Sequence, residues 1–145
     1  RCICVIGSDP QAFEYVTNSE LKKWKNFQIF GKIPHEEVLK LMGKSLIYIG
    51  NSDSDGMPNT MLEAIFMGAF PVQSNPGGVT AELIQHGVNG LLIEDCEDVD
   101  QMVFVIKSSL IQNYTLAQNE NSKIAETLTY DIIKDEVLQV YQQLK

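Results

Sequence analysis

The chain alternates short apolar runs with segments of helical spacing, and this alternation limits the folds open to it more than any other feature. Runs typical of buried strands occur at residues 2–6, 27–30, 46–49, 70–73 and 90–93. The segments between them mostly show the apolar spacing of helices. Strands joined by crossover helices run parallel. The sequence therefore predicts an α/β fold, a Rossmann-like three-layer domain with a parallel sheet of five or six strands.

The helical segments are bounded by turn and cap residues. We expect helices at residues 10–24, 34–43, 58–68 and 80–86, then three carboxyl-terminal helices at 99–110, 115–127 and 130–144. The third of these helices begins at Pro58 or at Thr60. With 145 residues and 44% hydrophobic content, the chain is long enough to bury one core. We therefore expect a single domain over residues 1–145.

The charge and the cysteine content limit the classes of partner and ligand that we expect for this chain. The formal net charge is -8 and no cluster of Lys and Arg stands out, which argues against a nucleic-acid partner. No apolar run reaches the roughly 18 residues that span a bilayer, and the first residues of this sequence do not show the basic, apolar and small-residue segments expected of a signal peptide. Three cysteines offer no disulfide framework, so Cys2, Cys4 and Cys96 are expected to be buried free thiols. These features predict a cytoplasmic protein with no membrane-spanning segment and no bound metal.

The segment from residue 50 to residue 78 holds the candidate site. Asp55 follows the strand at 46–49, and Glu63 lies in the helix after it. In open parallel sheets ligands bind beyond the carboxyl ends of the strands, so both carboxylates can face one crevice. Thr60 and Glu63 also spell a capping box, in which Glu63 would satisfy a backbone amide at the start of the helix. Both interpretations of Glu63 stay open at this stage.

Several short motifs follow one another in the same region. In chain order they are Asp55-Gly56, Glu63-Ala64, Gly68, Pro71-Val72, Gly77-Gly78, Glu82 and Gly87-Val88-Asn89-Gly90-Leu91. This order resembles the carboxyl-terminal, donor-binding domain of retaining glycosyltransferases with the GT-B architecture, of the glycosyltransferase family 4 (group 1) type. Asp55 stands where that family usually has a glutamate. In that family an Arg and Lys pair, which clamps the donor diphosphate, normally lies just upstream of the strand that opens this sequence. These 145 residues contain neither that pair nor the family's acceptor domain.

The resemblance implies a role for each matching residue. It places Asp55 at the catalytic position beside the donor sugar and Glu63 on the ribose hydroxyls of the donor nucleotide. The residues just before the helix would present backbone amides to the diphosphate or to sugar hydroxyls; they are Gly56, Met57, Pro58, Asn59 and Thr60. Gly77 and Gly78 would let the donor approach the backbone closely, and Glu82 would cap or orient this glycine loop. An ordinary strand-to-helix turn is the other interpretation of the glycine pair.

The implied activity is transfer of a hexose-type sugar from a nucleoside diphosphate to a hydroxyl acceptor, in polysaccharide or glycolipid synthesis. The family's chemistry is metal-independent, and the leaving phosphate itself takes the acceptor proton. No cofactor is expected beyond the nucleoside-diphosphate sugar. The expected partner is an amino-terminal acceptor domain of the same protein, and without it the 145-residue chain is expected to bind donor weakly and to transfer nothing.

Two other interpretations compete with this one. Asp53-Ser54-Asp55 has the spacing of the Asp-x-Asp motif that holds Mn²⁺ or Mg²⁺ in the other glycosyltransferase architecture. A non-catalytic Rossmann-like binding or interaction module is also compatible with the fold, because a fold alone does not determine function. The first loop reads Gly7-Ser8-Asp9-Pro10, without the glycine pattern of a dinucleotide site.

Overall fold

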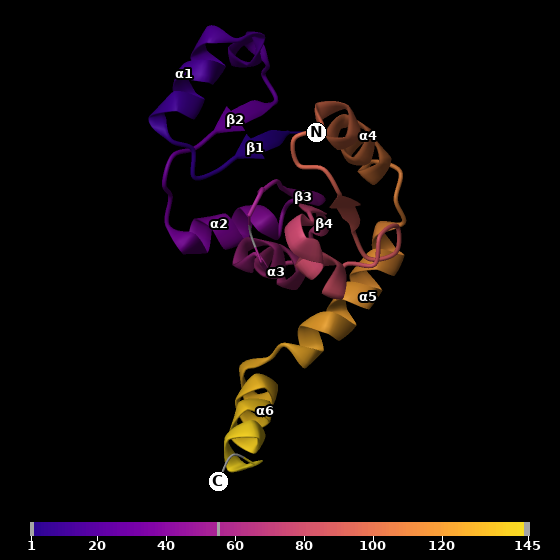
Figure 1. Ribbon diagram of the computed structural model, residues 1–145. Helices are drawn as coiled ribbons and strands as arrows, with labels where there is room; N and C mark the ends of the chain where they lie inside the picture. Colours follow the sequence, from indigo (N-terminus) through magenta and orange to yellow (C-terminus); the bar gives the residue numbers. More distant parts are fainter. Residues whose placement is uncertain (1, 55, 144–145) are drawn as a thin grey trace. The chain divides into compact units, whose positions relative to one another are not determined.

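The computed structural model of the protein describes residues 2–54 and 56–143, and its contacts divide the chain into two compact units, Arg1–Leu41 and Met42–Lys145 (Figure 1). Strands and helices alternate in the predicted order. Within the described residues the strands are β1 (Ile3–Val5), β2 (Phe27–Ile29), β3 (Ile47–Gly50), β4 (Phe70–Ser74) and β5 (Leu91–Ile93). All of their pairings are parallel, as predicted.

The expectation of one continuous sheet is wrong for the described part of the chain. β1 pairs with β2, and a separate sheet has the order β3-β4-β5. The sequence pattern sets the direction of each strand but not its neighbours, which depend on long-range packing. No described residue of the first unit is buried, so the burial that orders a sheet is concentrated in the second unit.

The first unit contains a helix that is shorter than predicted. α1 covers Pro10–Asn18, and the Asp9 side chain caps it by accepting a hydrogen bond from the Ala12 amide at 2.8 Å. The predicted helix at 10–24 is therefore interrupted, and its remainder forms a short 3-10 helix, η1, at Glu20–Lys23. The second helix, α2, covers His35–Met42 and has acidic residues in its first turn, where they complement the helix dipole.

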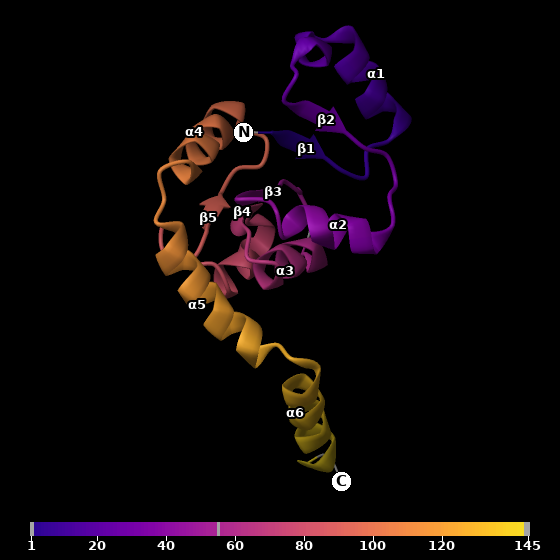
Figure 2. The same cartoon turned by 180° about the vertical axis from the view of Figure 1, so that it is seen from behind.

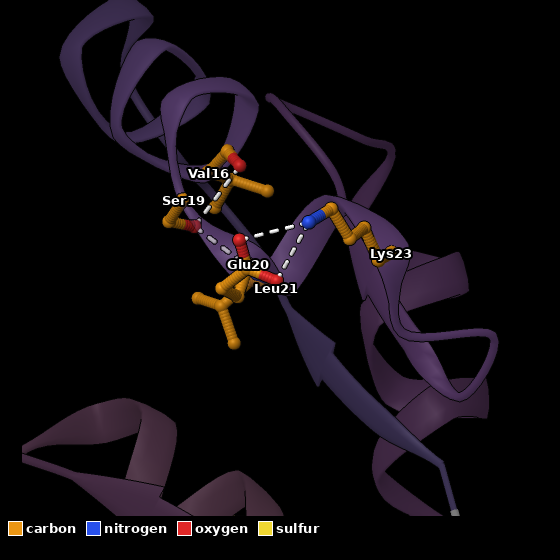
Figure 3. Close-up of polar contacts among 5 residues, drawn as sticks. All are labelled: Val16, Ser19, Glu20, Leu21 and Lys23. Atoms are coloured by element: carbon orange, nitrogen blue, oxygen red, sulfur yellow. Dashed lines mark hydrogen bonds and ion pairs between the residues drawn. The ribbon is translucent and has the colours of Figure 1, made fainter.

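A single serine accounts for the interruption. The Ser19 hydroxyl donates to the Val16 carbonyl at 3.0 Å and accepts from the Leu21 amide at 3.2 Å (Figure 3). A side chain that bonds the backbone in this way competes with helix continuation. The 3-10 helix that follows contains an exposed ion pair between its first and last residues, with 2.8 Å between Glu20 Oε2 and Lys23 Nζ.

The thiols of the first strand also differ from expectation. Cys2 and Cys4 are exposed, although they were expected to be buried, and their sulfur atoms lie 4.0 Å apart. They lie in the first unit, of which residues 2–41 are described and none is buried. Partial desolvation raises the pKa of the Cys4 thiol, and the neighbouring Cys2 thiol adds to the rise.

In the second unit, helices cover both faces of the β3-β4-β5 sheet, as predicted for parallel strands (Figures 1 and 2). α3 (Asn59–Phe66) lies over one face, where Met61, Ile65, Ile84 and Leu92 form a buried cluster. α4 (Val99–Ser109) and α5 (Tyr114–Thr127) lie over the other face. The second cluster consists of Phe70, Val72, Leu91, Ile93, Val105 and Ala117.

The carboxyl-terminal helices confirm the prediction almost residue for residue. After α4 and α5 comes α6 (Tyr130–Gln143), and each described residue of α6 is exposed. The helix expected at 80–86 is different: a 3-10 segment, η2, covers Pro76–Glu82. It begins early because Pro76 can open a helical turn, and it stays irregular because two glycines within it have positive φ. Within residues 2–54 and 56–143, no helix is long and apolar enough to cross a membrane.

Candidate functional site

The candidate site lies at the edge of the second sheet where β3, β4 and β5 end. β3 and β4 are hydrogen-bonded neighbours with Gly50 opposite Gln73, and β5 lies on the other side of β4. The loops that leave these strands therefore emerge side by side. They carry Gly56, Met57 and Pro58 after β3, and Gly77 and Gly78 after β4. The structure thus brings the two predicted donor-binding segments to one edge of one sheet.

Ser74, at the end of β4, joins these loops. Its hydroxyl accepts from the Ser52 amide and donates to the Ser52 carbonyl, both at 2.8 Å. Its own carbonyl accepts from the Thr80 hydroxyl at 2.9 Å, within η2. Both Ser74 and Thr80 are buried, so these bonds are shielded from water. The sequence analysis missed this network, because a serine in an apolar strand gives no local sign of its partners.

The loop after β3 has a second attachment. The Asn51 amide group donates to the Cys96 carbonyl at 3.0 Å, in the loop that follows β5. The start of the β3 loop is thus tied both to the end of β4, through Ser74, and to the loop after β5, through Cys96. Residues farther along it, including Asp53 and Gly56, are exposed. Asp55, the predicted catalytic residue, lies outside the described residues.

The start of α3 overturns the capping-box interpretation. The cap position is occupied by Pro58, which makes no side-chain capping bond, and the helix begins at Asn59. Thr60 is therefore the second residue of the helix and not its cap, and its hydroxyl lies 2.9 Å from the Tyr48 hydroxyl. Proline sets φ for entry into a helix but offers no oxygen on its side chain to accept from the first amides. Pro58 therefore provides no side-chain cap for the amino end of α3.

Glu63 lies one turn into α3. It is half-buried and shares a helix face with Asn59, four residues before it. The buried residues Met61 and Ile65 lie on another face, against the core. Helical side chains lean toward the amino end of their helix, so the Cα–Cβ bond of Glu63 is tilted toward the first turn of α3. Glu63 therefore shares a helix face with the first residue of α3, and its ligand role stays a prediction.

The glycine loop after β4 is open at its two glycines and held at its base. Gly77 and Gly78 have φ of 72° and 83°, and no heavy atom lies within 4 Å of an added Cβ at either position. The backbone amide of Asn75 donates to the Ile93 carbonyl at 3.0 Å, and the side-chain oxygen of Asn75 accepts from the Ala81 amide at 3.2 Å. A positive φ favours glycine, and the missing side chains leave the backbone accessible to a ligand.

Glu82 lies at the far end of η2. It is exposed and lines a hollow of about 280 Å³ together with Glu120 and Lys123 of α5, which form an ion pair at 2.7 Å. Gly77 and Gly78 lie near the beginning of η2. Among residues 2–54 and 56–143, no group of three or more His, Cys, Asp and Glu side chains could hold a metal ion.

The Gly-Val-Asn-Gly-Leu block builds a turn that the Asn89 side chain holds together. Asn89 is 3% exposed; its side-chain oxygen accepts from the Gln85 amide at 2.7 Å, and its nitrogen donates to the Leu83 carbonyl at 2.9 Å. At Gly90 an added Cβ would lie 2.9 Å from both Ile84 Cγ2 and the Pro71 carbonyl oxygen. This turn enters β5 at its amino end, the edge opposite to the candidate site.

The family is now identifiable. The sequence profile described as "Glycosyl transferases group 1" matches residues 2–126. The chain belongs to this family. Its motif order and the edge at which the loops gather agree with that membership. A search of curated proteins gave no significant match.

Solved glycosyltransferase structures of the GT-B class share the fold. Anabaena HepE (Alr3699), crystallised in complex with UDP-glucose, is 15% identical with a TM-score of 0.69; the match covers 98% of this chain and 41% of HepE. The pneumococcal O-GlcNAc transferase GtfA, in complex with UDP and GlcNAc, is 19% identical with a TM-score of 0.71, over 99% of this chain and 29% of GtfA.

A third similar structure is the sucrose-phosphate synthase of Thermosynechococcus elongatus. It is 20% identical with a TM-score of 0.73, over 97% of this chain and 38% of the synthase. At these identities the likeness shows the fold. The chain spans between 29% and 41% of the length of these three proteins.

Proposed function

We propose that this chain is the nucleotide-sugar-binding half of a retaining glycosyltransferase, which moves a hexose-type sugar from a nucleoside diphosphate to a hydroxyl acceptor. Family membership supports the reaction class. Two similar structures are complexes with sugar-nucleotide ligands: HepE with UDP-glucose, and GtfA with UDP and GlcNAc. UDP-sugars are therefore the first donors to test. Polysaccharide or glycolipid synthesis in the cytoplasm is the proposed setting.

One observation carries the proposal: the uncapped amino end of α3 and the open glycine loop lie on neighbouring strand ends. The first amides of α3 and the positive end of its dipole favour a diphosphate. Gly77 and Gly78 offer unobstructed backbone from the next loop. The Ser74 bonds to Ser52 hold the two loops in register before any ligand arrives. Preorganisation of this kind reduces the entropic cost of binding.

Glu63 is proposed to bind the ribose of the donor. A carboxylate can accept hydrogen bonds from both hydroxyls of a ribose at once. The competing role, a capping box with Thr60, requires Thr60 at the cap position, which Pro58 occupies instead. Hydrogen bonds to a charged group contribute roughly 1.5 to 3 kcal/mol, which corresponds to about a ten- to a hundredfold change in affinity.

The remaining roles follow from the same arrangement. Asp55 is proposed to contact the donor sugar, and Glu82 to orient η2 behind the glycine loop. The leaving phosphate takes the acceptor proton, so no side chain of this half acts as a general base and no metal ion is required. Catalysis then depends on holding the diphosphate and aligning the acceptor. An acceptor domain elsewhere in the protein would supply that alignment, and the isolated chain would transfer nothing.

Calorimetry tests the proposal. The complete gene product is titrated with UDP, UDP-glucose and GDP, with and without excess chelator. We expect binding of at least one nucleotide, unchanged by the chelator, because the proposed site uses backbone amides and Glu63 instead of a metal. The Glu63→Gln variant should bind about ten- to a hundredfold more weakly. Glu136→Gln, at an exposed position on α6, serves as the matched control and should bind normally.

Two outcomes of this titration would contradict the proposed metal-independent donor site. No affinity for any nucleotide at millimolar concentration would favour a non-catalytic interaction module. Complete loss of binding in chelator would favour a metal site at Asp53 and Asp55. Equal affinity of Glu63→Gln and the unaltered protein, at equal melting temperature, would remove the ribose role of Glu63 while leaving the donor site itself in place.

A further inference from the structure

We propose that Tyr48 is a positioning residue of the donor site, which acts through Thr60 to hold the first turn of α3. The inference rests on the proposed function, because that turn is the proposed diphosphate cradle. The hydroxyl groups of Tyr48, on β3, and Thr60, on α3, lie 2.9 Å apart and form a hydrogen bond. The bond joins the floor of the site to the segment that faces the ligand.

The ring of Tyr48 is anchored in the core, so its hydroxyl is well placed to act as a tether. Tyr48 packs against the cluster that contains Met61 and Ile65, which are 0% and 4% exposed. Its hydroxyl emerges from this cluster beside the first turn of α3. A tether is useful there because Pro58 supplies no capping bond, and uncapped helix ends fray.

The neighbouring residues leave room for this hydroxyl. Gly50 lies two residues after Tyr48 and therefore on the same sheet face, opposite Gln73 of β4. An added Cβ at Gly50 would lie 2.7 Å from the Tyr48 hydroxyl oxygen and would overlap Gln73 Oε1. Gln73 is 2% exposed, and its Oε1 has no hydrogen-bond partner in the described part of the chain. A small polar cluster is thus built beneath the start of α3, where a side chain at Gly50 would displace it.

The tether predicts a specific pattern of coupling. Tyr48→Phe keeps the ring in the core and removes only the hydroxyl, whereas Thr60→Val removes the partner at nearly constant shape. If the bond positions the first turn, either change should weaken UDP binding by about three- to tenfold. The double variant should then bind UDP about as tightly as the single variant with the lower affinity, because both changes break the bond between the two hydroxyls. Thr60→Ser should recover at least part of the affinity lost in Thr60→Val.

The experiment uses the complete gene product, with UDP calorimetry, melting temperature and amide hydrogen exchange over residues 59–61. Tyr48→Phe should speed exchange in this turn as it weakens UDP binding. The matched control is Tyr114→Phe, whose hydroxyl donates to the Ser109 carbonyl at 2.6 Å on the opposite sheet face. This control should lower the melting temperature and leave UDP affinity within about twofold.

The outcomes separate the two proposals. If the unaltered protein binds UDP and Tyr48→Phe changes neither affinity nor exchange, or if the effects of the two single variants simply add, the tether is wrong and the donor site stands. If the unaltered protein binds no nucleotide, the donor site is wrong and the inference fails with it. Weaker binding with the predicted coupling and faster exchange supports the inference.

Discussion

Replacing Asn89 by alanine should destabilise the second unit by about 2 to 5 kcal/mol. The Asn89 carboxamide is the shared partner of two backbone groups, the Gln85 amide and the Leu83 carbonyl, at 2.7 and 2.9 Å. Removing the carboxamide leaves the Gln85 amide and the Leu83 carbonyl without this partner, at a position where Asn89 is only 3% exposed. Each such loss costs about 1 to 3 kcal/mol, and water reaching the opened turn reduces the upper limit.

The assay is equilibrium urea unfolding followed by circular dichroism, with UDP affinity measured on the folded variant. Asn119→Ala is the matched control, because Asn119 is exposed on α5. The control should change the free energy of unfolding by no more than about 0.5 kcal/mol. UDP affinity of Asn89→Ala should stay within about twofold of the unaltered protein, since the turn lies at the edge of the sheet away from the candidate site.

Two results would refute this reasoning. A loss of stability below about 1 kcal/mol, similar to that of Asn119→Ala, would show that the turn does not depend on the carboxamide. A loss of UDP affinity at unchanged stability would place Asn89 in the binding site and not in the scaffold.

Three further changes test other features. Gln73→Leu should leave the free energy of unfolding unchanged or raise it by about 1 kcal/mol in urea unfolding. The reason is that the buried Gln73 Oε1 has no hydrogen-bond partner among residues 2–54 and 56–143, while Nε2 makes one long bond, 3.3 Å to Ser74 Oγ. A loss of stability above about 1 kcal/mol would contradict this account. Gly78→Ala should lower the free energy of unfolding by about 1 to 2 kcal/mol, because Gly78 has a positive φ. Gly56 is equally open but has no positive φ, so Gly56→Ala should lower it less. Equal losses in the two variants would argue against backbone strain at Gly78. The rate of iodoacetamide labelling of Cys4, followed by mass spectrometry, should reach its midpoint at a higher pH than that of free cysteine. The reason is that the raised pKa keeps the Cys4 thiol protonated to higher pH. A midpoint at or below that of free cysteine would contradict this prediction.

Local patterns predicted most elements because their signals are carried by neighbouring residues. The capping side chains Asp98 and Asn113 mark the beginnings of α4 and α5, and both bonds are present. α1 shows where such signals fail: Ser19 interrupts a continuous helical pattern through bonds to its own neighbours. Apolar spacing alone does not reveal that competition, because a serine is compatible with either a helix or a turn.

The candidate site was predictable in outline and not in its construction. The order of Glu63, Gly77 and Gly78 along the chain, with a strand before each segment, places them at one edge of a parallel sheet. The role of Glu63 could not be decided from the sequence, because Thr60 and Pro58 each can begin a helix. The structure removes the capping box with Thr60 by starting α3 at Asn59, and the ribose role of Glu63 stays a prediction. It also adds Tyr48, whose partner lies twelve residues away.

The amino-acid sequence by itself determined the strand and helix order, the parallel direction and the segments that carry the candidate ligand contacts, because these depend on periodicity and turn chemistry over a few residues. Only the tertiary structure decided which strands are neighbours, that Ser74 joins the site loops, and that Asn89 serves the turn before β5. These features depend on contacts between residues distant in the chain, and a linear pattern does not specify which distant groups meet.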